Sequence, residues 1–290
     1  MKPFTIYHSI SESFQGQHER LVSLIREVVQ PEIVYLLGAS LYRRRSESIF
    51  CPISPSSQHM ADYCFLVLIK NTNSKSLPQL QDQIEQHCSS AMPVTIFLLE
   101  TVIFNSWLAT GHLFARTVYQ SGVSVYAAVF FSLSPVGHYN AEVELKNLEK
   151  LFREGLNKSQ EFIAGADLFT LRKRYNLAAF MLHQAAEQAL GTLLKIGTGY
   201  HCCTHNIERL LRYAGMVSYQ IPDIFPRKTD NEKKLFSLLQ KGYIDSRYRK
   251  DYSIGFTDLN ELTERVRIIQ DILAEYGKTN FHKTDGKQTC

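Results

Sequence analysis

The sequence predicts an α+β protein of two domains, in which a mixed sheet with helices precedes an up-and-down bundle of helices. Before Pro135, short apolar runs rich in β-branched and aromatic residues alternate with helical segments. After Pro135 the spacing of apolar residues becomes helical. The 290 residues suffice for two domains of ordinary size, and we place these at residues 1–138 and 139–277.

Buried strands are predicted where a short run of β-branched and aromatic residues occurs before the boundary. These runs are residues 33–37, 65–69, 94–99 and 123–129. Helical segments lie around and between them, at residues 14–29, 78–88 and 103–120. Residues 46–60 are rich in serine and proline, which predicts a loop.

Long helices are predicted beyond the boundary, and their short polar connections favour an up-and-down bundle. They are residues 141–164, 172–196, 205–214, 230–248 and 257–276. Thr204 and Thr257 stand at N-cap positions, and Gly197, Gly199 and Gly277 are stop signals. The polar residues 278–290 are predicted to form a disordered tail.

Composition and charge narrow the class of protein. The contents of 44% hydrophobic and 21% charged residues are those of a globular chain. No apolar run is long enough to span a bilayer and no secretion signal is visible, so we expect a cytoplasmic protein without a membrane partner. Nine basic and nine acidic residues precede Tyr139, out of 32 and 28, so the whole excess of +4 lies in the C-terminal half. That excess mildly favours a polyanionic partner there.

Arg247 is the first candidate binding residue. It lies at the end of an apolar helical stripe and shares a face with Leu239 and Tyr243. A guanidinium matches phosphate geometry, so this position suggests an anion site at the edge of the bundle. The alternative is an arginine that pairs with Asp245 or Asp251 at a solvated helix end.

A second candidate site lies in the N-terminal half. Gly38 and Ser40 form a small-residue turn after a strand, and we expect the chain to enter a helix that carries Arg43, Arg44 and Arg45. Asp62 then leads into the next strand. This order, together with residues 111–116 and 120–123, resembles the nucleotidyltransferase superfamily over about the first 130 residues. The resemblance implies Mg²⁺ and a nucleoside triphosphate, held by carboxylates.

The carboxylates that this chemistry needs are incomplete. Residues two apart on a strand share a face, but the partner position of Asp62 is Cys64. Thr95 and Phe97 occupy the next strand, where a third carboxylate is expected, and Glu100 is the only substitute nearby. We therefore expect an inactive site with Asp62 as its one metal ligand. Gly38 and Ser40 then bind a nucleotide or form only a turn and N-cap.

Three motifs follow one another in the helical half. They are Gln-Ala-Ala-Glu at residues 184–187, Thr-His-Asn at 204–206 and Asp-Ser-Arg-Tyr at 245–248. In this order they resemble HEPN domains, helical bundles named for nucleotide binding in higher eukaryotes and prokaryotes, over residues 140–276. The resemblance implies a nucleotide or RNA ligand, a homodimer, and a nucleotidyltransferase-like domain as a recurrent neighbour.

The same resemblance bears on catalysis. Many HEPN domains are RNases with an arginine followed, several residues later, by a histidine; here Tyr252 stands after Arg247. A phenol is a poor base at neutral pH, so we expect phosphate binding without catalysis. Arg247, Arg249 and Lys250 would contact phosphate, with Tyr248 stacking on a base, Glu187 orienting Arg247, and His183 as a further candidate.

Other functions stay open at this point. His205 is either a ligand contact or a local helix-start residue, and residues 201–205 offer a zinc site with poor cysteine spacing. The chain could be a toxin-like RNase restrained by its N-terminal domain, or an active nucleotidyltransferase that modifies Tyr248 or Tyr252. It could also be a purely structural module.

Overall fold

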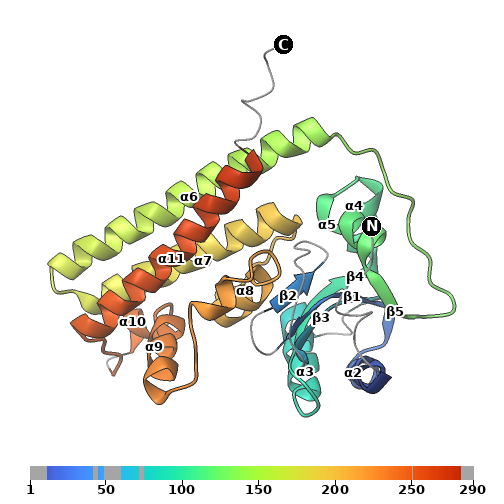
Figure 1. The fold of residues 1–290 in the computed structure, drawn as a ribbon, viewed down its shortest axis with the longest axis horizontal. Helices are drawn as coiled ribbons and strands as arrows, with labels where there is room; N and C mark the ends of the chain where they lie inside the picture. The colour runs from blue at the N-terminus through green and yellow to red at the C-terminus, as the bar shows by residue number, and fades with distance from the viewer. Residues whose placement is uncertain (1–11, 42–44, 49–59, 72–74, 250, 282–290) are drawn as a thin grey trace. The chain divides into compact units, whose positions relative to one another are not determined.

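The computed structural model describes residues 12–41, 45–48, 60–71, 75–249 and 251–281. The chain divides into two compact units, Met1–Tyr139 and Asn140–Cys290. The first unit is built on a sheet and the second on helices (Figure 1). Each unit is described separately below.

The sheet of the first unit has five strands in the described residues. These are β1 (Pro31–Leu41), β2 (Arg45–Ser48), β3 (Met60–Ile69), β4 (Val94–Glu100) and β5 (Val123–Ala127). β3 lies between β4 and β1, while β5 and β2 pair end to end along the other edge of β1. The β3–β4 pair is parallel and the others are antiparallel, which confirms a mixed sheet.

Helices cover both faces of this sheet (Figure 1). α2 (Glu12–Val28) and α3 (Leu77–Cys88) pack on the face formed by alternate residues of β3, such as Phe65 and Val67. α4 (Thr101–Ala109) and α5 (Leu113–Ser121) pack on the opposite face, where Phe97 contacts Phe114. α3 also supplies the crossover that a parallel β3–β4 pair requires.

The predicted helix after Ser40 is wrong. β1 continues to Leu41, and Gly38 is paired with Cys64 on one edge and with Ser48 on the other. Arg45 begins β2, so residues 46–48 of the predicted loop are strand as well. Strand pairing on both sides satisfies the backbone groups that a helix start would have left free for an anion. Arg43 and Arg44 lie outside the described residues, as do residues 49–59.

The predicted helix at residues 103–120 is divided into α4 and α5. The break occurs at Gly111, which has a φ of +71° that side chains rarely adopt. A Cβ at Gly111 would collide with the carbonyl of His138, and the Gly137 N–H donates to the Leu108 carbonyl at 2.8 Å. The segment that leaves the first unit therefore packs into this break.

The second unit is helical, as predicted. Its helices are α6 (Ala141–Leu171), α7 (Tyr175–Thr198), α8 (Ile207–Ala214), α9 (Asp230–Lys241), α10 (Asp245–Tyr248) and α11 (Phe256–Phe281), with a 3-10 turn at Ile221–Asp223. α7 is central and packs against the other five. A buried Ser159 hydroxyl donates to the Ala185 carbonyl and accepts from Gln270, which joins α6, α7 and α11.

The ends of several helices differ from the prediction. Thr257, a predicted N-cap, lies inside α11, and Gly197, a predicted stop signal, lies inside α7. Asn206, rather than Thr204, caps α8. α9 ends at Gly242, so Arg247 lies on a separate short helix. Gly277 does not end α11: a Cβ there would enter the Phe152 ring, so this glycine lets two helices approach, and the helix runs into the predicted tail as far as Phe281. Gly199, with a φ of 82°, does end α7 as predicted.

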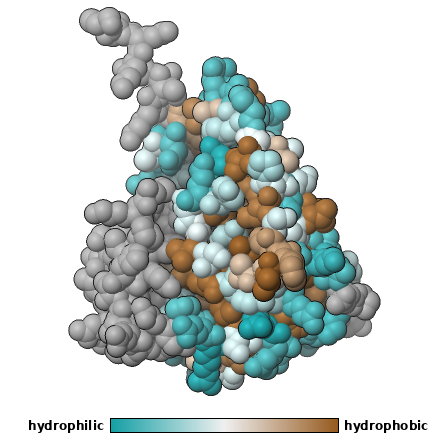
Figure 2. Space-filling view, turned by 90° about the vertical axis from the view of Figure 1, so that its right-hand side faces the viewer, coloured by the Kyte–Doolittle hydropathy of each residue, from teal (hydrophilic) through white to brown (hydrophobic). Residues whose placement is uncertain are grey.

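Hydrophobic and polar side chains are interspersed over the face seen in Figure 2. Among the described residues of the first unit, the most exposed large hydrophobic side chains are Val102, Val129 and Phe130.

No helix within the described part of the chain has the length and apolar character needed to cross a membrane. The cytoplasmic location stays a prediction.

Candidate functional site

Arg247 lies on the surface of the helical unit with its guanidinium held against aromatic rings. Its Nε donates to the Tyr243 carbonyl at 2.8 Å. Its Cζ lies 4.7 Å from the ring centroids of Phe180 and Tyr243, and 5.0 Å from that of Tyr248. The backbone bond and the rings restrict the guanidinium to one region of the surface.

The pairing of Arg247 with a helix-end carboxylate is not observed. Asp245 pairs with Arg249 at 3.3 Å instead. Within the residues that the structure describes, no carboxylate lies within ion-pair distance of Arg247. Its positive charge is therefore available to an external anion.

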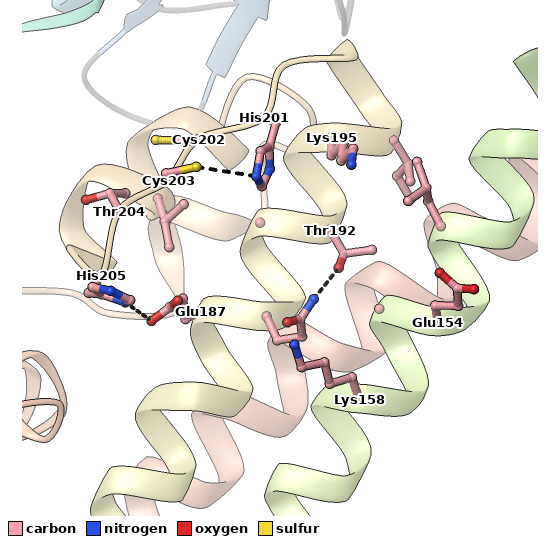
Figure 3. Close-up of a pocket in the computed structure, with 16 residues that line it drawn as sticks. Glu154, Lys158, Glu187, Thr192, Lys195, His201, Cys202, Cys203, Thr204 and His205 are labelled. Atoms are coloured by element: carbon pink, nitrogen blue, oxygen red, sulfur yellow. Dashed lines mark hydrogen bonds and ion pairs between the residues drawn. The ribbon is translucent and has the colours of Figure 1, made fainter. Parts of the chain in front are cut away.

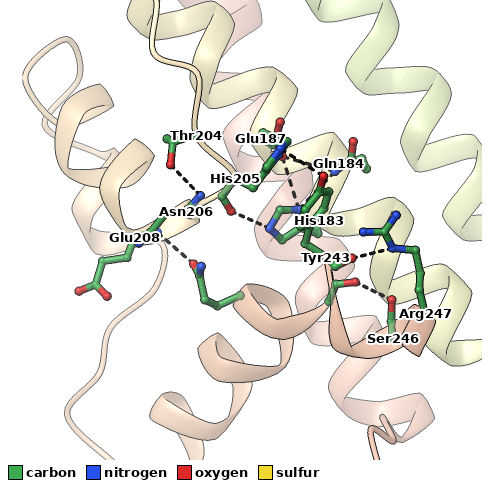
Figure 4. Close-up of polar contacts among 12 residues, drawn as sticks. His183, Gln184, Glu187, Thr204, His205, Asn206, Glu208, Tyr243, Ser246 and Arg247 are labelled. Carbon is green, nitrogen blue, oxygen red and sulfur yellow. Dashed lines mark hydrogen bonds and ion pairs between the residues drawn. The ribbon is translucent and has the colours of Figure 1, made fainter. Parts of the chain in front are cut away.

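A chain of polar contacts begins at Tyr243 and runs away from Arg247 (Figure 4). The Tyr243 hydroxyl lies 3.2 Å from His205 Nε2, and the two rings stack with centroids 4.1 Å apart. His205 Nδ1 lies 2.9 Å from a Glu187 carboxylate oxygen. Because a carboxylate only accepts, Nδ1 donates to Glu187, and in the neutral imidazole Nε2 then accepts from the tyrosine hydroxyl.

The expected contact between Glu187 and Arg247 is replaced by this chain. Glu187 accepts from His205 at 2.9 Å and from Gln184 at 3.4 Å. It therefore orients an imidazole rather than a guanidinium.

His183 is a core residue with no exposed side-chain surface. Its Nε2–H donates to the His205 carbonyl at 3.1 Å, which holds the segment before α8 in place. Burial lowers the pKa of His183 to about 4, so the ring is neutral at pH 7. The structure thus gives this predicted binding residue a positioning role behind His205.

Tyr252, at the position of the family's histidine, is also structural. Its side chain is buried, and its hydroxyl donates to the Leu238 carbonyl at 2.9 Å. Burial, and secondarily Asp245, raise the pKa of the hydroxyl well above its ordinary value. A buried, fully engaged phenol is unsuited to accept a proton from a substrate.

The remaining residues predicted to contact the ligand differ in how accessible they are. Tyr248 is 74% exposed, so its ring is free to stack on a planar group. Arg249 is partly neutralised by its pairing with Asp245. Lys250 lies outside the described residues.

In the sheet unit, the positions at which the resemblance places Mg²⁺ ligands lie close together on β3 and β4. Asp62 accepts from the Thr95 hydroxyl at 2.8 Å, and Cys64 is level with Thr95 in the sheet. Glu100 is level with Ile69, about 20 Å along the strand from Asp62 at ~3.3 Å per residue, so it does not substitute.

One carboxylate, a thiol and a hydroxyl do not match the oxygen ligands that Mg²⁺ requires. Gly38 and Ser40 lie in β1 beside these positions, with Ser40 opposite Asp62. Within the described ranges, no three histidine, cysteine or acidic side chains are grouped so as to hold a metal ion. That finding also covers the zinc interpretation of residues 201–205, where Cys203 Sγ contacts His201 Nε2 at 3.4 Å.

Two aromatic contacts of the site were not predicted from the sequence. Phe180 packs against Arg247 from another helix, and Tyr243 links Arg247 to His205. A helical-spacing signal was present, because Phe180, Gln184 and Glu187 recur on one face of α7. What no local pattern indicated is that α10 packs onto that face.

Comparison with known proteins defines the class of the helical unit. Residues 141–276 match the model of the HEPN domain family. The predicted resemblance of the helical half to HEPN domains is thereby confirmed.

One solved structure, a nucleotidyltransferase-like protein from Exiguobacterium sibiricum, aligns with 94% of this chain and 81% of its own. The sequence identity is 11% and the TM-score 0.31, a likeness too low to carry an argument about this chain. The curated proteins contain no match.

Proposed function

We propose that the helical unit binds the phosphate groups of a nucleotide or of RNA through Arg247, without catalysing a reaction. One observation carries the proposal: an exposed guanidinium is fixed by its Nε and by three rings, yet has no carboxylate partner in the described chain. Its other four N–H groups make no hydrogen bond to described residues, which leaves a fork that matches a phosphate.

The surroundings of Arg247 support a nucleic-acid ligand over a lone phosphate. Tyr248 presents an exposed ring beside the guanidinium, and bases of single-stranded RNA stack on such rings. The excess of basic residues in the C-terminal half attracts a polyanion. The HEPN match agrees with a nucleotide-related role.

The test is a titration of the full-length protein with a short single-stranded RNA, followed by fluorescence anisotropy at several salt concentrations. We expect Arg247→Ala to weaken binding about tenfold. We also expect the slope of log affinity against log salt to fall by about 0.7, the value for one phosphate contact on a single strand. Tyr248→Ala should weaken binding with little change in slope.

Arg267→Ala is the matched control, since it removes the same charge from a surface arginine that pairs with Asp167 and Glu264. Equal weakening by Arg247→Ala and Arg267→Ala would mean that net charge alone attracts RNA, and the proposal would fail.

A second candidate function has one observation in its favour. His205 is half exposed and is oriented by Glu187, as an acid–base histidine often is. We propose RNA cleavage dependent on His205 as the alternative to simple binding. Loss of any cleavage in both His205→Ala and Arg247→Ala would support it, whereas intact RNA with the wild-type protein excludes it.

The homodimer implied by the HEPN resemblance is a proposal as well. Leu177, Ile244 and Tyr248 are large, exposed and close in the sequence to the residues that surround Arg247. Sedimentation of the wild type should then give a dimer, and Ile244→Glu a monomer.

A further inference from the structure

The helical unit contains a pocket of about 510 Å³ that is separate from Arg247. It lies between α6, α7 and the segment that leads to α8 (Figure 3). Small-molecule sites span roughly 300–1,000 Å³, so the pocket suits a metabolite. Leu151, Ile196 and Leu210 give it an apolar wall.

Two lysines from different helices line this pocket. Lys158 comes from α6 and reaches towards α7, while Lys195 lies in the last turn of α7, nearer the end of that helix (Figure 3). Neither forms an ion pair or a side-chain hydrogen bond with any residue that the structure describes. Two ammonium groups without a carboxylate partner in one pocket lining attract negative charge.

The two carboxylates that line the pocket are already engaged. Glu187 accepts from His205 at 2.9 Å, and Glu154 lies 3.8 Å from Lys150. Neither carboxylate forms an ion pair with Lys158 or Lys195. The positive charge of Lys195 also acts on His201, another residue of the pocket lining. The pKa of His201 is lowered mainly by burial and secondarily by Lys195.

Gly191 of α7 borders the pocket. It lies in the interior of α7, where glycine costs about 1 kcal/mol relative to alanine. A Cβ at Gly191 would meet no atom within 4 Å, unlike one at Gly155, which would collide with Thr192. Gly155 is thus explained by close helix packing, whereas Gly191 borders empty space.

We propose that this pocket binds a small molecule with a phosphate monoester group, for which Lys158 and Lys195 supply the positive charge. Such a group carries nearly two negative charges at neutral pH, which matches two ammonium groups better than a single carboxylate does. Gln188, Thr192 and Thr204 add neutral polar groups, and the apolar wall receives the remainder of the molecule. The pocket lining includes Glu187 and His205 of the polar chain but neither Arg247 nor the three rings around it, so the site goes beyond phosphate binding at Arg247.

Calorimetric titration of the full-length protein tests the proposal with four probes: adenosine monophosphate, glucose 6-phosphate, inorganic phosphate and adenosine. We expect binding of a phosphate ester and none of adenosine. Comparison of the two esters shows whether a nucleoside or a sugar carries the phosphate. Lys158→Met and Lys195→Met keep the aliphatic stem and should each weaken binding about tenfold or more.

Gly191→Leu should abolish binding by filling the pocket, while its thermal unfolding shows that the fold is intact. Lys146→Met removes the same charge from α6, and neither Lys146 nor its partner Glu142 lines the pocket, so this variant should leave the affinity unchanged. Gly191→Leu should also leave RNA binding at Arg247 unchanged. A failure of the pocket proposal can therefore be distinguished from a failure of the RNA-binding proposal.

Three outcomes overturn the proposal. The first is that neither ester binds at millimolar concentration. The second is that the pocket variants bind like the wild type. The third is that Lys146→Met weakens binding as much as Lys195→Met.

Discussion

Two histidines of the helical unit illustrate how burial decides the role of a residue. His205 is half exposed and contacts Glu187 and Tyr243, so it is accessible to a ligand. His183 is fully buried, and its Nε2–H donates to the His205 carbonyl, which holds the segment before α8 in place. An exposed histidine is therefore a candidate ligand contact, whereas a buried histidine positions the backbone behind it.

We predict that His183 makes the protein acid-sensitive. Its pKa is about 4 when folded and 6.5 ordinarily, so below about pH 6.5 the unfolded chain gains a proton that the folded chain excludes. Stability is then unaffected above that pH and falls by roughly 3 kcal/mol as the pH drops towards 4. Urea unfolding across this pH range measures the effect.

His183→Gln retains an N–H donor and does not titrate, so it is the matched variant. Its stability should be lower than that of the wild type at neutral pH and should decline less on acidification. Parallel pH curves for the two proteins would show that other groups cause the acid sensitivity.

At the scale of elements, glycines control how closely the helices pack. Gly277 lets α11 lie against Phe152 of α6, and Gly155 lets α6 lie against Thr192 of α7. Gly242 ends α9 and allows α10 to turn back onto α7. A glycine such as Gly277, which resembles a helix stop signal in the sequence, can therefore mark a close contact between two helices.

We predict opposite effects of the same substitution in two helices. Gly191→Ala should stabilise the protein by about 1 kcal/mol, because alanine favours the helix and its methyl group enters free space. Gly277→Ala should destabilise it by about 1–3 kcal/mol through overpacking against Phe152. Thermal unfolding of both variants tests the pair, and Phe152→Leu combined with Gly277→Ala should recover part of the loss.

At the scale of the whole molecule, the chain consists of two units with separate cores. Residues of the sheet unit form one hydrophobic cluster and those of the bundle another. The Arg247 cluster and the lysine pocket draw all their residues from the bundle.

We predict that a fragment of residues 140–290 folds and binds RNA with the affinity of the full-length protein, since its core and its Arg247 cluster are complete. Circular dichroism and the anisotropy titration check this. A fragment that is folded yet no longer binds would place part of the RNA site in the sheet unit.

Much of the architecture was predictable because its signals are local. The β-branched runs around Val34, Val67 and Ile96 predicted strands that the structure contains. The failures occurred where distant partners decide the conformation. Gly38 lies in a strand because Cys64 and Ser48 pair with it, and the continuous helix predicted through Arg247 is interrupted where Gly242 packs near the backbone of Ala179.

The sequence by itself determined the two-part architecture, the HEPN motifs and the shortage of carboxylates around Asp62, because periodicity and residue identity can be assessed along a single chain. Only the tertiary structure decided that Arg247 packs on Phe180, that Tyr252 is buried, and that Lys158 and Lys195 line one pocket. These relations join residues from different elements, and they depend on packing geometry that no local pattern encodes.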